Sequence, residues 1–153
     1  MVDKYHLFSS CISCVYHDIQ KIERMEMEKY GLKGPHAQCL LIMGLHPEGI
    51  TAARLCEVCE KDKAAISRIL VELEQAGMIL RQSQNGTRYR ASLMLTEQGR
   101  KASEAVKEKA QLAVEQACLG LNDKQQEMFY QVLSLVSRNL HTICKDGLQT
   151  EKV

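Results

Sequence analysis

The sequence has 153 residues, of which 45% are hydrophobic and 25% are charged, proportions typical of a folded globular chain and not of a disordered one. Twenty lysines and arginines against nineteen aspartates and glutamates leave a net charge of +1, so any surface that binds nucleic acid must be local. The two prolines and nine glycines favour long helices and argue against an all-β sandwich.

A long amphipathic helix is predicted between Tyr5 and Lys29. Its apolar residues recur at steps of three and four and form one stripe, made of Phe8, Cys11, Ile12, Val15, Ile19, Ile22 and Met25. A helix at one end of a chain must lay such a stripe against another surface. Pro35 then starts a second helix, which carries an apolar run at residues 40–43. His36 and His46 lie at its two ends, where we expect exposed or capping residues rather than metal ligands.

Two short helices follow and are joined by a tight turn. Thr51 is a good N-cap for the first, whose buried face is predicted to consist of Ala52, Leu55, Cys56 and Cys59. Asp62 caps the second helix and Gly77 ends it. The apolar residues of this second helix are Ile66, Ile69, Leu70, Leu73 and Ala76.

The pattern then changes to that of strands. Residues 78–83 and 88–95 flank Asn85-Gly86, and Asn-Gly is the strongest short hairpin signal. Thr96 caps a long helix that runs to about residue 119, and Asn122 or Asp123 starts a last one, with a stripe of Met128, Val132, Val136, Leu140 and Ile143. The fold class is therefore mostly α, an α+β chain of five or six helices with one β-hairpin.

Two short helices followed by a hairpin predict a winged helix-turn-helix fold. With its buried residues removed, the second short helix presents Lys63, Ala64, Ser67 and Arg68 on its outer side. Small side chains there let a helix approach base edges in a DNA groove, while Arg68 could bind guanine through two hydrogen bonds and Lys63 could meet phosphate. This face predicts DNA binding.

The local charge supports the same interpretation. Residues 61–90 include six basic and three acidic residues, and Arg88 and Arg90 lie on the non-core face of the hairpin near its tip, where a wing reaches a minor groove or the backbone. A local excess of positive charge can also be a solvated face, and many helix-turn-helix units only mediate protein contacts. Both interpretations stay open on the composition alone.

Four motifs resemble the MarR family of bacterial transcriptional regulators: Gly49-Ile-Thr-Ala-Ala-Arg-Leu-Cys, Asp62-Lys-Ala-Ala-Ile-Ser-Arg, Leu73-Glu-Gln-Ala-Gly-Met-Ile and Leu95-Thr-Glu-Gln-Gly. The resemblance runs from about Tyr5 to Cys144. The family often has an Asp-x-Arg pattern in the wing, and the Asp is missing from Asn85-Gly-Thr-Arg-Tyr-Arg. Either Arg88 or Arg90 could therefore take the groove-reading role.

The resemblance implies a winged helix-turn-helix domain over residues 1–146, with a flexible tail at residues 147–153. Within it, residues 5–30 and 97–144 would be dimerisation helices and residues 35–96 the DNA-binding lobe. A homodimer of this kind binds two half-sites about 34 Å apart on a pseudo-palindrome of double-stranded DNA. The implied function is a ligand-responsive repressor in the cytoplasm, released from DNA by a small-molecule effector.

The residues expected to contact DNA follow from this resemblance together with the exposed helix face. Lys63, Ser67 and Arg68 would read the major groove. Arg81, Arg88 and Arg90 would contact the backbone or the minor groove, and Thr51 and Arg54 would touch phosphates. Ala64 and Asn85 complete the set. The alternative from another class is a dimeric winged-helix module that binds a protein partner and not DNA.

The N-terminus has no basic segment leading into an apolar run, so we expect no secretory signal. The seven cysteines are therefore predicted to be reduced thiols of a cytosolic protein. Cys56 and Cys59 form a C-x-x-C pair on an apolar helix face, where packing explains them better than metal binding. Cys11 and Cys14 lie where peroxide-sensing members of the resembled family carry a reactive cysteine. A redox-sensing regulator that uses these two residues is therefore a second interpretation, beside simple packing.

Enzymatic function finds no support in the sequence. It contains no Gly-rich phosphate loop, no H-E-x-x-H and no nucleophile elbow. We therefore expect no catalytic residue, no cofactor and no metal. The sequence also lacks a run of about 20 apolar residues that could span a bilayer, so a membrane is not an expected partner.

Overall fold

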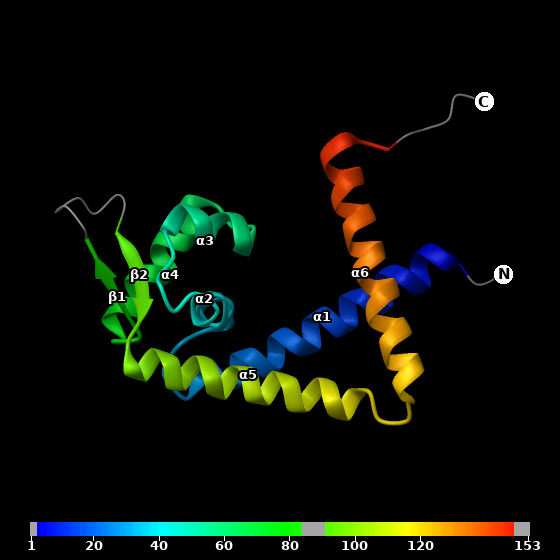
Figure 1. The fold of residues 1–153 in the computed structure, drawn as a ribbon, viewed down its shortest axis with the longest axis horizontal. Coiled ribbons are helices and arrows are strands. Elements are labelled where there is room, and N and C mark those ends of the chain that lie inside the picture. The colour runs from blue at the N-terminus through cyan, green and yellow to red at the C-terminus, as the bar shows by residue number, and fades with distance from the viewer. Residues whose placement is uncertain (1–2, 84–90, 149–153) are drawn as a thin grey trace. The chain divides into compact units, whose positions relative to one another are not determined.

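The computed structural model describes residues 3–83 and 91–148. Its elements, shown in Figure 1, are α1 (Lys4–Glu28), α2 (Gly34–Gly44), α3 (Ala52–Cys59), α4 (Lys63–Gln75), β1 (Ile79–Gln82), β2 (Ser92–Leu95), α5 (Glu97–Ala117) and α6 (Asp123–Asp146). The predicted fold class, mostly α with one hairpin, is confirmed. The chain divides into two compact units, Met1–Ala113 and Val114–Val153.

The helix boundaries are set by the caps that the sequence predicts. The Thr51 hydroxyl oxygen accepts a hydrogen bond from the amide of Arg54 at 3.2 Å, and an Asp62 carboxylate oxygen accepts one from the amide of Ala65 at 2.8 Å. Each cap satisfies an amide that the first turn of its helix leaves without a partner. Gly77, just beyond α4, has a φ of +70°, which glycine adopts more easily than any other residue.

The hairpin is shorter than predicted in its described part. Strands β1 and β2 are antiparallel, with Ile79 opposite Leu95 and Gln82 opposite Ser92. The loop before α3 joins this sheet through Ile50, whose amide donates to the Leu93 carbonyl at 3.0 Å and whose carbonyl accepts from the Leu93 amide at 2.8 Å. The wing is thereby tied to the start of the helix-turn-helix.

The core of the first unit lies beneath α2, α3, α4 and the hairpin, and the N-terminal half of α5 covers part of it. Its most buried large side chains, all under 2% exposed, include Leu40, Met43, Leu55, Ile66, Leu70, Leu73, Met78, Leu93 and Val106. Burial of one such side chain contributes about 1.5–3 kcal/mol. A buried hydrogen bond also joins α5 to α2, because the Ser103 hydroxyl donates to the Leu40 carbonyl at 3.0 Å.

The predicted stripe of α1 is largely exposed in the single chain. Phe8 and Ile12 are each 43% exposed, and Val15 is 56% exposed. Met25, at the end of the same stripe, is also 58% exposed, whereas Met27 is fully buried. The reason is that only the C-terminal end of α1 joins the core, so most of its apolar face has no covering surface within this unit.

In the second unit, α6 begins at an Asn122 cap, whose side chain accepts from the Gln125 amide at 3.0 Å. None of its residues is buried. The exposed large apolar side chains of α6 are Met128, Phe129, Tyr130, Val132, Leu133, Leu135, Leu140 and Ile143. A contiguous apolar face of this extent is rare on a protein that remains a monomer.

The Leu-Thr-x-x-Gly motif has a structural explanation. The Thr96 hydroxyl donates to the Gly77 carbonyl at 2.7 Å and accepts from the Gly99 amide at 3.0 Å. Gly99 lies so close to the backbone of Met78 that a Cβ there would collide with the Met78 carbonyl. The motif thus locks the start of α5 against the end of α4.

We expect Gly99→Ala to destabilise the protein by about 2 kcal/mol, because the added methyl forces α5 away from the Met78 carbonyl. In thermal unfolding followed by circular dichroism, this corresponds to a fall in Tm of roughly 4–8 °C. The matched control is Gln98→Ala, an exposed position in the same turn, with an expected change within about 0.5 kcal/mol. Wild-type stability in Gly99→Ala would contradict this account of the motif.

Candidate nucleic-acid interface

Helices α3 and α4 form the helix-turn-helix. The turn between them passes through Glu60, whose φ is +52°, and then reaches the Asp62 cap. One face of α4 is buried through Ile66, Ile69, Leu70 and Leu73. On the opposite face, Lys63, Ala64, Ser67 and Arg68 are all exposed. The structure therefore brings together the four residues that were predicted to face a DNA groove.

Arg68 occupies the middle of this outer face. Among the interactions between described residues, its side chain takes part in no hydrogen bond or ion pair. Val71, one turn further along the helix, is 44% exposed and continues the same face. A guanidinium presented in this way keeps its donors available for an acceptor outside the chain.

Thr51 and Arg54 lie at the N-terminal end of α3 and are both exposed. The Thr51 hydroxyl oxygen caps the helix, and the Arg54 guanidinium is 2.9 Å from a carboxylate oxygen of Glu57. Both partners of this ion pair are mostly exposed, and such pairs contribute only about 0–1 kcal/mol. A phosphate could therefore replace Glu57 as the partner of Arg54 at little cost.

Arg81 has a structural partner that the sequence did not reveal. Its Nε lies 2.8 Å from a carboxylate oxygen of Glu74, and the two side chains are 23% and 30% exposed. This partly buried pair ties β1 to the C-terminal part of α4. The other predicted wing residues, Asn85, Arg88 and Arg90, lie outside the described residues.

A second polar contact holds α4 in place and was also missed from the sequence. His36 is only 2% exposed. Its Nδ1 accepts from the Lys33 amide at 3.0 Å, and its Nε2 lies 2.6 Å from a carboxylate oxygen of Glu72. His36 was expected to be either an exposed or a capping residue, and it caps α2 while its ring is buried between α2 and α4. A separation of 36 positions along the chain leaves no local pattern that would indicate this pair.

Four cysteines were considered for redox sensing or for packing. Cys11 and Cys14, the residues considered for redox sensing, are both exposed in the single chain. Cys59 is buried, as packing on the apolar face of α3 requires, while Cys56 is only partly buried. In the described part of the chain, no group of three or more His, Cys, Asp or Glu side chains is placed to hold a metal ion.

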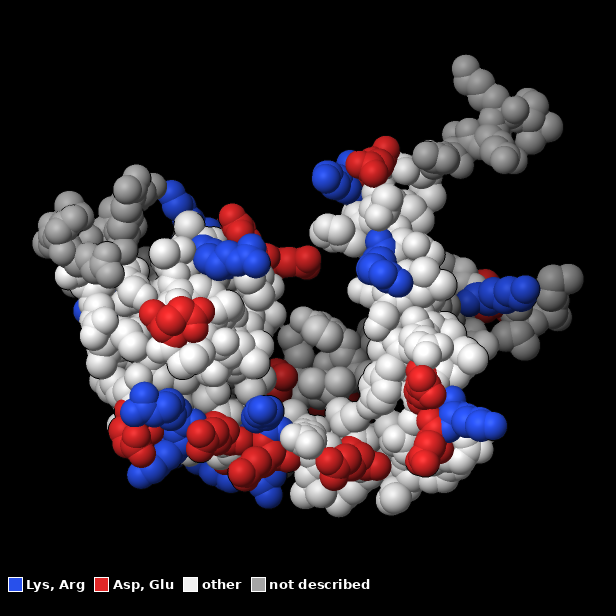
Figure 2. Space-filling model, viewed as in Figure 1, with Lys and Arg blue, Asp and Glu red and all other residues white. Residues whose placement is uncertain are grey.

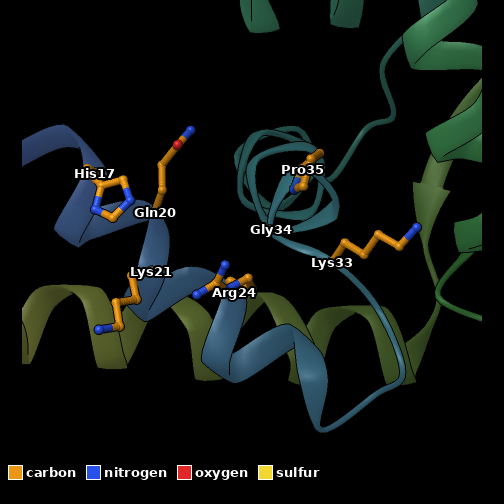
Figure 3. A pocket seen from close by; sticks show the side chains of 7 residues that line it. All are labelled: His17, Gln20, Lys21, Arg24, Lys33, Gly34 and Pro35. Carbon is orange, nitrogen blue, oxygen red and sulfur yellow. The ribbon is translucent and has the colours of Figure 1, made fainter. Parts of the chain in front are cut away.

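A pocket of about 320 Å³ lies between α1 and the start of α2. Figure 3 shows its lining: His17, Gln20, Lys21 and Arg24 from successive turns of α1, with Lys33, Gly34 and Pro35 from the start of α2. Three of these residues are basic, and no carboxylate is among them. Carboxylates just outside the lining compensate part of this charge, because Arg24 lies 3.8 Å from a carboxylate oxygen of Glu28 and His17 lies 3.7 Å from one of Asp18.

The charges of α5 differ from those of the outer face of α4. Figure 2 shows basic and acidic side chains interspersed along α5. Arg100 and Lys101 both pair with Glu97, at 2.9 and 3.6 Å, and the Arg100 guanidinium helps to hold the pKa of that carboxyl below its usual range. A surface with alternating charges has little attraction for a polyanion.

Two short helices joined by a tight turn and followed by an antiparallel hairpin define the winged helix-turn-helix class. Residues 30–88 match the model of the MarR family. Among curated proteins, none has a sequence that matches this chain. The prediction that the chain resembles the MarR family is confirmed by this match, and the solved structures below share its fold.

Several solved structures have the same fold over almost the whole chain. A MarR-family transcriptional regulator from Listeria monocytogenes, complexed with 26mer DNA, is 19% identical with a TM-score of 0.77, covering 93% of this chain and 96% of that one. A MarR transcriptional regulator from Methanosarcina mazei Go1 is 23% identical with a TM-score of 0.80 and 94% coverage of both chains. MepR of Staphylococcus aureus, a regulator of the multidrug efflux pump MepA, is 18% identical with a TM-score of 0.67, covering 87% and 98%.

None of the helices within residues 3–83 and 91–148 combines the length and the apolar character needed to cross a membrane.

We expect Glu72→Ala to lower the free energy of unfolding by about 1 kcal/mol, because it leaves the buried His36 ring without its partner on α4. Unfolding in urea, followed by circular dichroism, measures this loss. Glu72→Gln keeps an acceptor oxygen in place and should lose clearly less. Equal losses in both variants would mean that the hydrogen bond with His36 does not help to hold α4.

Proposed function

We propose that this protein is a DNA-binding transcriptional regulator that acts as a homodimer on a pseudo-palindromic site in double-stranded DNA. The observation that carries the proposal is the exposed face of α4, where Ala64 and Ser67 leave room beside Lys63 and Arg68. DNA in complex with the similar regulator from Listeria monocytogenes supports the same conclusion.

The contacts follow from the position of each side chain. Arg68 pairs with a base edge in the major groove, and Lys63 and Arg54 bind phosphates on either side. Thr51, at the start of α3, can donate its hydroxyl hydrogen to a further phosphate while its oxygen caps the helix. Arg81 acts mainly by positioning α4 through Glu74, and a backbone contact would require it to leave that pair.

The homodimer is supported by the apolar faces of α1 and α6. Both helices expose large apolar side chains along most of their length, and covering them with a second copy would remove this surface from water. Two copies would also supply the two recognition helices that a pseudo-palindrome requires.

Regulation by an effector is supported by the pocket between α1 and α2. Its basic lining favours a small anionic molecule, and α1 belongs to the proposed dimer interface whereas α2 belongs to the DNA-binding lobe. An anion bound between them shifts the population between dimers that fit DNA and dimers that do not. Release of DNA on binding would make the protein a repressor that responds to its ligand.

Arg68→Ala is expected to weaken binding to a selected DNA site by about 1–3 kcal/mol, or roughly 5- to 150-fold, and to relax the choice of base at one position in each half-site. Fluorescence anisotropy with a site selected from a random duplex pool measures the affinity, at two salt concentrations. The expected loss of affinity comes from the missing hydrogen bonds to a base edge and not only from the missing charge.

The matched control for this measurement is Arg100→Ala, which removes the same charge from α5. It should bind DNA like the wild type. Equal losses of Arg68→Ala on the selected site and on random DNA would overturn the base-reading role. Weak binding of the wild type to every duplex, with little dependence on salt, would instead favour a winged-helix module for a protein partner.

Val132→Glu is expected to weaken dimerisation at least about 100-fold, since a carboxylate would be buried in an apolar interface. Sedimentation velocity over a range of protein concentrations measures the change. Ser134→Glu adds the same charge two residues along, on the polar side of α6, and should leave the dimer intact. A monomeric wild type at micromolar concentration would contradict the proposed homodimer.

A further inference from the structure

Val71 is an exposed apolar side chain on the outer face of α4. It is 44% exposed and does not belong to the buried face of the helix. Because a helix turns by about 100° per residue, Val71 lies roughly 150° from the middle of that buried face. Arg68 lies at a similar angle on the other side, with Ala64 between them. A single exposed valine is common on protein surfaces, so its place on this face, and not its exposure, is the informative feature.

The side chains that precede Val71 along this face are short. Ser67 lies one turn before Val71, and Ala64 lies one turn before Ser67. A helix face without long side chains can approach base edges closely in a major groove. Valine also has one strongly preferred rotamer in a helix. Its two methyl groups are therefore held in place before DNA binds, and little conformational entropy is lost on contact.

The Val71 side chain can discriminate among bases because it neither donates nor accepts a hydrogen bond. In the major groove, guanine, adenine and cytosine present polar edges, whereas thymine adds a C5 methyl group. Over a polar edge, Val71 would exclude water without replacing its hydrogen bonds, and this costs free energy. Over a thymine methyl group, it removes apolar surface of both partners from water. Thymine is therefore the base that this side chain favours.

We propose that Val71 is a specificity-determining residue that contacts the C5 methyl group of one thymine in each half-site. This contact rests on the proposed function and adds to it a base contact that Arg68 does not make. Three residues along a helix correspond to a rise of about 4.5 Å, and one base pair along DNA corresponds to about 3.4 Å. The thymine is therefore expected about one or two base pairs from the base that Arg68 reads.

The contact is tested by comparing the full-length wild type with Val71→Ala. This substitution removes both γ methyl groups of the valine, and alanine favours the helix. A site is selected from a random duplex pool with the wild type, and each thymine in it is replaced in turn by deoxyuridine, which lacks only the C5 methyl group. Fluorescence anisotropy measures the dissociation constant for each duplex. Thermal unfolding followed by circular dichroism verifies that Val71→Ala is folded.

For the wild type, we expect deoxyuridine at one thymine position to weaken binding about fourfold in one half-site and about 15-fold when both half-sites carry it, as for one buried methyl group in each. In Val71→Ala, the same replacement should change the affinity less than about twofold. The matched control is Val58→Ala, because Val58 on α3 is 39% exposed and lies outside the α4 face. It should keep the wild-type pattern.

A deoxyuridine effect of equal size in the wild type and in Val71→Ala would overturn the contact, because it would come from the shape of the DNA and not from Val71. A selected site in which no thymine is sensitive to the loss of its methyl group would overturn it as well. Both outcomes leave the proposed function intact, since the wild type still selects a site. A wild type that selects no site and binds every duplex equally would overturn the proposed function together with the contact that rests on it.

Discussion

The packing of α4 against the core of the lobe decides which side chains this protein can present to a partner. Burial of Ile66, Leu70 and Leu73 fixes the rotation of the helix, and the helical period then turns Arg68 outward. Two polar contacts hold the same helix at different points, from His36 to Glu72 and from Arg81 to Glu74. Hydrophobic burial thus supplies most of the stability, and the polar contacts restrict α4 to one orientation.

Helix α2 connects the parts of the molecule that are proposed to act together. It packs against α1 and α4, carries His36, and forms one wall of the basic pocket with its first residues. An anion in that pocket would act directly on this helix. Coupling between α1 and the DNA-binding helix α4 therefore needs no long pathway, because α2 packs against both.

The local features of the fold were predictable because each depends on a few neighbouring residues. Caps at Thr51 and Asp62 and the glycine after α4 all have short-range causes, and their positions agree with the structure. The outer face of α4 was predictable for a similar reason, since removing the apolar positions of a regular helix leaves only one exposed side. The predicted apolar stripe of α1 was less accurate at its C-terminal end, where Met25 is exposed and Met27 is buried. Periodicity alone does not tell how far a helix stays in contact with its core.

The sequence by itself determined the element order, the helix boundaries and the residues offered on α4, since these follow from periodicity, capping and turn chemistry. Only the tertiary structure decided the contacts between distant positions: His36 with Glu72, and Arg81 with Glu74. Each of these pairs joins different elements, and no repeating pattern along a chain encodes such a distance. The same reason explains Gly99, whose place in a motif was visible in the sequence but whose close approach to Met78 needed the folded chain.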